Sequence, residues 1–150
     1  MPFFKAVLLS HSKRYNNRAK VYSLKGEKKL ALADFNEALN INPNDVASLS
    51  NRAYLLYSIG EYRAGVSDCD RLIKLQPNYS LAYCVRGLCR QKLEQYRSAL
   101  FDLKTATKYS PDDMQLKQSI LLLEGMIEEQ KMNNSKDNND AGTMQNIFRI

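Results

Sequence analysis

The chain has 150 residues and a mass of 17.2 kDa, which allows one compact domain or one short repeat array and excludes two large domains. Hydrophobic residues make up 44% of it and charged residues 25%, a composition that excludes wholesale disorder and a protein with many membrane spans. The 22 Lys and Arg residues exceed the 16 Asp and Glu residues, and the resulting net charge of +6 favours acidic partners only mildly.

The chain opens with MPFFKAVLLSHS, an apolar stretch that Lys5 interrupts. This stretch is too short to span a membrane, and it has neither a basic leader nor a small-residue cleavage site. Because proline is favoured in the first turn of a helix, Pro2 predicts a short N-terminal helix over residues 1–11.

A repeat with a period of 34 residues follows, and it is marked by Pro43, Pro77 and Pro111. Small side chains recur in the same register at Ala19, Ala53 and Gly87, and again at Ala31, Gly65 and Ala99. A fixed period of this length is the signature of a repeat architecture. The sequence therefore predicts three units, which cover residues 12–45, 46–79 and 80–113.

Each unit is expected to be an antiparallel pair of helices. In the second unit, apolar residues at helical spacing form one face before Gly60 and another after it: Leu49, Ala53, Leu56 and Ile59, then Tyr62, Val66, Cys69 and Ile73. Short polar residues that can cap the following helix lie at Asn44, Asp45, Asn78, Ser80, Asp112 and Asp113. The predicted fold class is all-α, a stack of helix hairpins in which the small residues let paired helices approach closely.

The residues after Pro111 are expected to close the array. Leu116, Ile120, Leu123 and Ile127 form an apolar stripe, which is typical of a capping helix over residues 114–132. The next segment, NNSKDNNDAGTMQN, is polar, rich in Asn and without periodicity, so we expect residues 133–150 to be a disordered tail.

Charged residues recur with the repeat as well. We call the following set the Arg–Asp ladder: Arg18, Arg52 and Arg86, and, 16 residues after each, Asp34, Asp68 and Asp102. In a helical hairpin this separation places each Arg opposite its Asp on the facing helix. We therefore expect an ion pair inside each unit, in preference to three arginines that are free to bind an acidic partner.

The repeated unit resembles that of the tetratricopeptide-repeat family. The resemblance is carried by NRAKVYSLKGEKKLALADFNEALNINP, NRAYLLYSIGEYRAGVSDCDRLIKLQP and VRGLCRQKLEQYRSALFDLKTATKYSP. The third unit departs from the pattern, with Glu94 where the others have Gly26 and Gly60, and with Arg90 at an apolar position. The resemblance implies a right-handed α-solenoid whose first helices line a concave groove that binds a peptide or a helix of another protein.

The expected groove residues are those of each first helix that lie outside its packing stripe. They are Lys13, Asn16, Asn17, Lys20 and Leu24 in the first unit, Ser50, Asn51, Tyr54, Tyr57 and Ser58 in the second, and Leu81, Cys84, Val85, Leu88 and Lys92 in the third. Along the array, these groove residues change from basic and amide side chains in the first unit to mostly apolar side chains in the third. They suit a protein or peptide ligand with an acidic end and an apolar end.

Co-chaperones of this family clamp the C-terminal carboxylate of Hsp70 and Hsp90 with two lysines, two asparagines and an arginine or lysine. Here Asn51 stands at a matching position, whereas Asn16, Lys20, Leu81 and Val85 occupy the other four. A carboxylate clamp needs several convergent donors, so we expect none in this chain. The predicted function is that of a protein-interaction adaptor or scaffold with a co-chaperone-like or complex-assembly role.

We expect no enzyme activity and no cofactor. The sequence contains no phosphate-binding glycine loop and no metal-ligand spacing, and His11 is its only histidine. The three cysteines, Cys69, Cys84 and Cys89, form no CxxC pair, which favours a reducing compartment and a cytoplasmic location.

An electrostatic association with nucleic acid is the alternative function. Residues 1–45 hold eight basic and four acidic side chains, and the basic ones include Lys13, Arg14, Lys20, Lys25, Lys28 and Lys29. Such a face attracts phosphates, but no aromatic residues are interleaved to stack on bases, so we do not expect a nucleic-acid reader.

The C-terminal end suggests self-association. Met144, Ile147, Phe148 and Ile150 gather apolar side chains next to the terminal carboxylate. A segment of this chemistry suits the apolar end of the groove, so docking of the tail into its own groove or into that of a second copy is a hypothesis.

Overall fold

The computed structural model describes the backbone of residues 2–147 and the side chains of residues 2–136. The described chain is entirely helical and contains no strand. Its helices are α1 (Pro2–Leu24), α2 (Lys28–Ile41), α3 (Val46–Ser58), α4 (Tyr62–Leu75), α5 (Ser80–Lys92), α6 (Tyr96–Tyr109) and α7 (Met114–Ile147).

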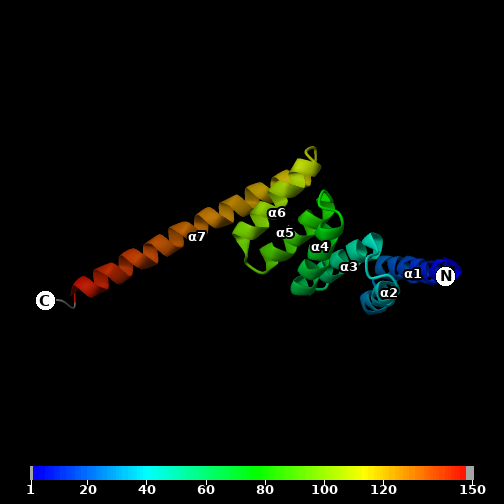
Figure 1. The fold of residues 1–150 in the computed structure, drawn as a ribbon. Helices are drawn as coiled ribbons and strands as arrows, with labels where there is room; N and C mark the ends of the chain where they lie inside the picture. Colours follow the sequence, from blue (N-terminus) through cyan, green and yellow to red (C-terminus); the bar gives the residue numbers. More distant parts are fainter. Residues whose placement is uncertain (1, 148–150) are drawn as a thin grey trace.

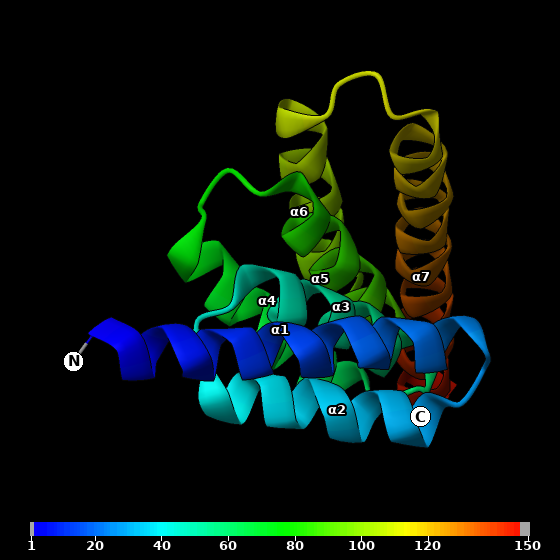
Figure 2. The same ribbon diagram turned by 90° about the vertical axis from the view of Figure 1, so that its right-hand side faces the viewer.

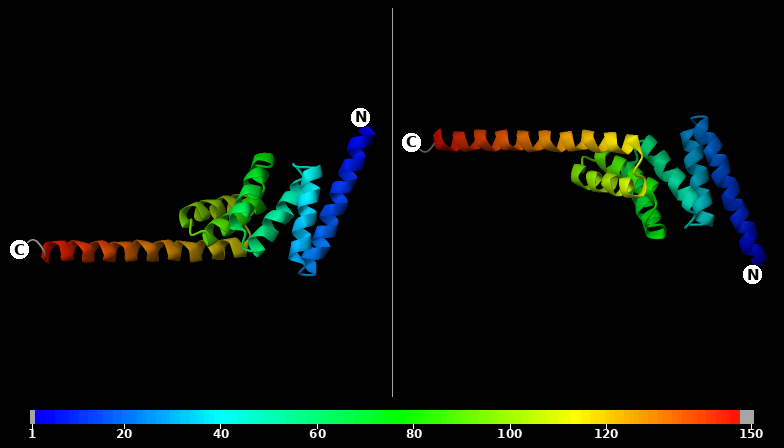
Figure 3. Two further views of the ribbon diagram at one scale, coloured as in Figure 1. Left: turned by 90° about the horizontal axis from the view of Figure 1, so that it is seen from below. Right: turned by 90° about the horizontal axis from the view of Figure 1, so that it is seen from above.

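The helices pair in chain order into three antiparallel hairpins, α1 with α2, α3 with α4, and α5 with α6 (Figure 1). Each hairpin packs on the next, and α7 packs on α6 and then extends well beyond it. Figure 2 shows α1 and α2 lying side by side at one end of the stack. Figure 3 shows that α7 lies at the other end. The predicted all-α stack of helix hairpins is confirmed.

The turn inside each hairpin places one residue in the left-handed region of the backbone. Gly26 has φ 77° and Gly60 has φ 86°, and at both positions the absence of a Cβ makes this conformation accessible at little cost. In the third hairpin, Glu94 adopts the same conformation with φ 60°. Glu94, which replaces the glycine of the other two turns, therefore preserves the turn geometry but adds local backbone strain.

Two glycines inside helices allow close helix contacts. A Cβ on Gly65 would lie 2.9 Å from Cys89 Sγ, and a Cβ on Gly87 would lie 2.9 Å from Leu103 Cδ2. Both distances are shorter than a van der Waals contact. The expected role of these small residues in close packing is confirmed.

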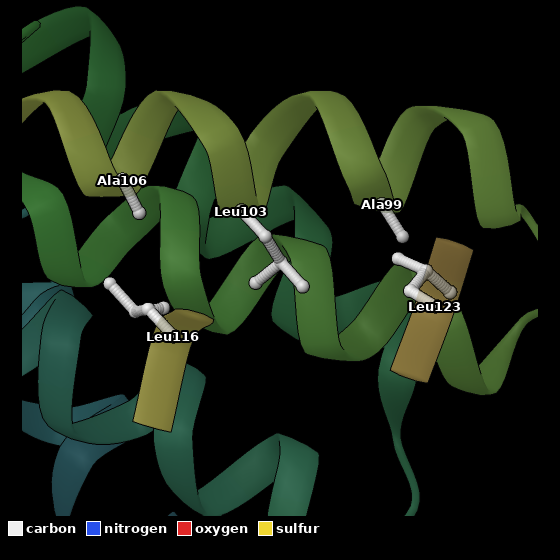
Figure 4. Packing of buried hydrophobic residues seen from close by; sticks show 5 residues of the cluster. All are labelled: Ala99, Leu103, Ala106, Leu116 and Leu123. Carbon is white, nitrogen blue, oxygen red and sulfur yellow. The ribbon is translucent and has the colours of Figure 1, made fainter. Parts of the chain in front are cut away.

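The α6–α7 contact shows how the array is closed. Leu103 of α6 is fully buried between Ala99 and Ala106, and all three side chains point toward Leu116 and Leu123 of α7 (Figure 4). Ile120 and Ile127 pack against the same cluster. The predicted apolar stripe of α7 therefore covers the last hairpin and removes its apolar face from water.

Side chains satisfy several helix ends and bridge the hairpins. Asp45 accepts a hydrogen bond from Ser48 N at the start of α3, and Asp113 accepts from Gln115 N and Leu116 N at the start of α7. These are two of the predicted caps. The sequence analysis did not predict that Ser12 and Ser80 would each donate to a backbone carbonyl of the second helix in their own hairpins.

Two expected boundaries differ from the structure. Helix α1 is continuous from Pro2 to Leu24, so residues 1–11 do not form a separate short helix. Helix α7 continues to Ile147, through much of the segment that was expected to be a disordered tail. Neither junction contains a proline, so the backbone can remain helical across both. The side chains of the predicted tail motif from Met144 to Ile150 lie outside the described residues.

Candidate functional site

The Arg–Asp ladder is formed as expected, with two hydrogen bonds in each hairpin. Arg18 Nε and Nη2 lie 2.6 and 2.8 Å from the Asp34 carboxylate. The corresponding distances are 2.7 and 2.6 Å for Arg52 with Asp68. They are 3.0 and 2.7 Å for Arg86 with Asp102. These arginines are therefore engaged within the fold, and the ladder is not a row of free cations.

The ladder is more extensive in the third hairpin. Arg86 also donates to Asp70 of the preceding hairpin at 2.7 Å, and Arg90 donates to Asp102 at 2.7 Å. Burial lowers the pKa of Arg86, but its hydrogen bonds to Asp102 and Asp70 outweigh this effect and raise the pKa above the usual arginine value. The hydrogen bond to Asp34 similarly raises the pKa of Arg18.

A depression of about 390 Å³ lies where α1, α2, α3 and the start of α5 meet. It contains seven of the predicted groove residues. Its lining consists of Lys20, Ser23, Leu24, Lys28, Phe35, Ser50, Asn51, Tyr54, Leu55, Ser58 and Leu81. We call this feature the α1–α3 depression.

Apolar side chains dominate the α1–α3 depression. Phe35 and Leu55 are buried, whereas Leu24, Tyr54 and Leu81 expose 88%, 60% and 44% of their surfaces. Exposed apolar side chains beside a hollow of this size are able to bury an apolar group of a ligand. The exposed lysines at positions 20 and 28 add positive charge to the same lining, although Lys28 Nζ also donates to Ser58 O at 3.3 Å.

One polar group of the α1–α3 depression lacks a partner. Ser23 Oγ is buried and makes no hydrogen bond among the described residues. A buried hydroxyl without a partner costs free energy, so it is a position where a ligand group could compensate.

Two amides fix part of the groove wall. Asn51 Nδ2 donates to Asn16 Oδ1 at 3.1 Å, which joins α3 to α1. Asn16 is buried, with 9% of its surface exposed. The hydroxyl oxygens of Ser50 and Tyr79 lie 3.1 Å apart and share a hydrogen bond. Asn51 therefore lines the α1–α3 depression, and its amide also links the first two hairpins.

The structure does not bring the remaining predicted residues into the α1–α3 depression. Lys13 and Asn17 line a separate shallow depression beside the first half of α1. Val85 is 2% exposed and belongs to a core cluster with Ala53, Cys69 and Cys89, so it packs instead of lining the groove. Tyr57, Cys84 and Leu88 are half-buried, and Lys92 is exposed.

Four lining residues were not in the predicted list. They are Ser23, Lys28 and Phe35 of the first hairpin and Leu55 of helix α3. Lys28 and Phe35 lie on α2, a second helix, and the prediction took groove residues from first helices alone. Lys28 had a sequence signal, because it occupies the position of Tyr62 and Tyr96 in the other units.

The cysteines show no sign of chemical activation. Burial raises the pKa of the Cys69 thiol strongly, and it raises the pKa of the Cys89 thiol to about 11. Burial raises the pKa of the Cys84 thiol as well. Over the described part of the chain, no group of three or more His, Cys, Asp and Glu side chains is placed to hold a metal ion.

A stack of helix hairpins with a ligand-sized depression between its first helices defines a helical-repeat protein. Models of the tetratricopeptide repeat match residues 12–45 and 81–113. This chain therefore contains tetratricopeptide repeats. No curated protein matches its sequence.

Solved structures of the same fold include several tetratricopeptide-repeat domains. The Arabidopsis OM64 domain is 19% identical, with a TM-score of 0.77 over 79% of this chain and 98% of that chain. The first domain of Spaghetti (RPAP3), bound to the HSP90 peptide SRMEEVD, is 18% identical, with a TM-score of 0.76 over 79% and 94%. The TPR2B domain of yeast Sti1, in complex with pHsp70, is 21% identical, with a TM-score of 0.73 over 78% and 98%.

These similarities establish the fold and confirm the fold class that the resemblance implied. Within residues 2–147, no helix is both long enough and apolar enough to cross a lipid bilayer.

Proposed function

We propose that this chain is a non-enzymatic adaptor that captures an extended or helical segment of another protein in the α1–α3 depression. The observation that carries the proposal is the composition of this hollow. Its lining combines exposed Leu24, Tyr54 and Leu81 with Lys20, and it includes the unpartnered Ser23 hydroxyl.

The lining defines the chemistry of the ligand. The apolar side chains favour an apolar ligand residue, since they remove its surface from water at roughly 25 cal/mol per Å². Lys20 favours a carboxylate close to that residue. The segment we propose therefore has an apolar residue beside an acidic one, or beside its own C-terminal carboxylate.

The related structures support a role in binding peptides. The peptide held by the Spaghetti domain, SRMEEVD, contains both acidic and apolar residues. A co-chaperone-like or complex-assembly role is therefore part of the proposal. We do not extend it to a carboxylate clamp of the Hsp70 and Hsp90 type, because Asn51 alone matches that set and its amide donates to Asn16.

The proposal includes the organisation of the chain. We propose that the three hairpins are three repeats, over residues 12–45, 46–79 and 80–113, and that α7 is the cap. Packing of α1 on α2 and α3 orders the lining before the ligand arrives, which lowers the entropic cost of binding. The buried Cys69 and Cys89 are free thiols, in keeping with a reducing, cytoplasmic location.

Selection from a library of random peptides displayed on phage tests the function directly. We expect the wild-type chain to enrich peptides with an apolar residue next to Asp or Glu. The double variant Lys20→Glu, Tyr54→Ala should lose at least about tenfold in affinity for those peptides, equivalent to about 1.4 kcal/mol.

The matched control is Lys29→Glu, Phe101→Ala. It makes the same charge change and removes an aromatic ring that is 67% exposed, but neither residue lines the α1–α3 depression. Equal binding by the two double variants would contradict the proposal. Binding of RNA that falls steeply with added salt, with no enriched peptide, would support the alternative based on the basic face of the first unit.

A further inference from the structure

Helix α7 carries a second apolar stripe that no side chain among residues 2–136 covers. Met114, Leu121 and Met132 expose 72%, 70% and 58% of their surfaces. At 100° per residue, these three and Gly125 lie on one face of the helix, opposite Leu116 and Leu123. We call Met114, Leu121, Gly125 and Met132 the outer stripe.

Gly125 is the unusual member of the outer stripe. A glycine inside a helix costs roughly 1 kcal/mol relative to alanine. At Gly65 and Gly87 the structure explains this cost, because a Cβ would come within 2.9 Å of a neighbouring helix. A Cβ on Gly125 would meet nothing within 4 Å. Within the described chain, no close neighbour accounts for a glycine at this position.

The repeat register shows what kind of neighbour fits. Leu121 follows Gly87 by one period of 34 residues, and Gly87 follows Ala53 by another. Gly87 faces the second helix of its own hairpin, because a Cβ there would contact Leu103 and lie 3.2 Å from Ala99 O. The outer stripe therefore occupies the place at which a first helix normally receives its second helix.

We propose that the outer stripe receives α7 of a second copy of this chain, so that two copies form an antiparallel α7–α7 dimer. A pairing centred near Leu123 places Met114 opposite the partner's Met132. It also places Leu121 of each copy over Gly125 of the other, where the missing side chain leaves room for a leucine. Each contact occurs twice, as twofold symmetry requires.

The charges beside the outer stripe fit the same pairing. In the antiparallel register, Lys117 of one copy is level with Glu128 of the other, and at 100° per residue both lie on the same side of the contact. Glu128 also pairs with Lys131 of its own helix at 2.6 Å. A parallel register would instead bring Glu128 of one copy beside Glu129 of the other, and it would place Lys117 beside Gln118. Opposite charges across a helix pair select orientation more strongly than they add affinity, so the antiparallel arrangement is favoured.

The size of the contact sets its expected strength. The outer stripe runs over Met114–Met132, about 27 Å at 1.5 Å per residue. Stable specific interfaces bury about 1,200–2,000 Å² in total, and a single helix pair of this length lies at the lower end of that range. We therefore expect a reversible dimer with a dissociation constant on the order of micromolar.

Sedimentation velocity of the full chain over a range of concentrations tests the proposal. We expect a monomer–dimer equilibrium for the wild type, and a monomer throughout for Leu121→Lys. Phe101→Lys is the matched control, because Phe101 is 67% exposed on α6 and lies outside the outer stripe. That variant should dimerise like the wild type.

Two further variants test the details of the contact. Gly125→Ala should raise the thermal stability of the dilute monomer and weaken the dimer about tenfold, two changes of opposite sign that a fold defect would not produce. Lys117→Glu should weaken the dimer, and the double variant Lys117→Glu, Glu128→Lys should restore it.

Four results would overturn the proposal. They are a wild-type chain that stays monomeric at all concentrations, a Leu121→Lys variant that still dimerises, a double charge variant that does not recover, and a dimer that is lost in Phe4→Lys. The last variant addresses the exposed apolar start of α1, where Phe3 and Phe4 are 81% and 66% exposed.

Discussion

The first and third hairpins share the Arg–Asp ladder but place it in different surroundings. In the first, the Arg18 side chain is 58% exposed and pairs with Asp34 alone, at the open end of the stack. In the third, the Arg86 side chain is 14% exposed, Asp102 is fully buried, and Arg90 and Asp70 join the network. The same spacing in the sequence therefore produces a single ion pair with an exposed arginine at one end and a buried network at the other.

This difference shows that the value of a repeated motif depends on the neighbours in the stack. An exposed ion pair contributes little because water and salt screen it. Breaking a buried pair is costly, because the remaining charges are left without partners in a medium that solvates them poorly. The turns inside the two hairpins differ as well. Gly26 in the first hairpin adopts the left-handed conformation without strain, whereas Glu94 in the third adopts it with strain.

The largest expected effect is that of Asp102→Ala. It leaves Arg86 and Arg90 without their shared carboxylate, and we expect it to lower the free energy of unfolding by about 3–5 kcal/mol. Urea denaturation followed by circular dichroism measures this. Asp68→Ala should cost less, because Asp68 pairs with Arg52 alone. Equal losses for the two variants would show that the extra partners of Asp102 add nothing.

A smaller effect should follow from pH through Cys89. Burial raises the pKa of this thiol from 9.0 to about 11, so the unfolded chain loses the proton at lower pH than the folded chain does. Its contribution is fully present below pH 9 and is lost as pH rises toward about 11, by on the order of 1–2 kcal/mol. Denaturation at pH 8 and pH 10.5 should show a smaller loss for Cys89→Ala than for the wild type.

Glu94→Gly is expected to stabilise the third hairpin. A residue with a Cβ pays about 1–2 kcal/mol in the left-handed region, and glycine removes most of this cost. We therefore expect a gain of about 1 kcal/mol. Gly60→Ala, which places a Cβ at the equivalent turn, should produce a loss of similar size. A Glu94→Gly variant that melts below the wild type would contradict this interpretation of the turn.

The smallest expected effect is that of Asp34→Ala. Although Asp34 is itself buried, Arg18 remains largely in water when its partner is removed, so no buried charge is left unpaired. The loss should therefore be well below that of Asp102→Ala and should shrink further in salt. Thermal melting at low and high ionic strength measures this directly. A loss as large as that of Asp102→Ala would abolish the distinction between the two ends of the stack.

The 34-residue period was enough to predict the hairpins and the ladder, because both depend on spacing along the chain and on helical geometry. The capping face of α7 was predicted for the same reason, since Leu116 and Leu123 share one side of a helix. The buried side chains that line the α1–α3 depression, Phe35 and Leu55, were not predicted. Phe35 reaches it from α2 because of the way that α1, α2 and α3 cross, and no single-helix pattern encodes this crossing.

The boundaries of α1 and α7 were less predictable for a different reason. An apolar start and an Asn-rich end suggested changes of structure, yet neither contains a proline that would end a helix. Val85 shows a related error in the site. Val85 follows Cys84 in α5 and is buried in one core cluster with Ala53 and Cys89. The sequence analysis interpreted its apolar side chain as part of the groove.

Site-specific photocrosslinking is the measurement that tests the central claim most directly. A photoreactive phenylalanine replaces Tyr54 in one sample and Phe101 in another, two aromatic positions that are 60% and 67% exposed. The account predicts that the probe at position 54 crosslinks to a peptide with adjacent apolar and acidic residues and that Lys20→Glu abolishes the product. Equal crosslinking from position 101, or a product that survives Lys20→Glu, would contradict it.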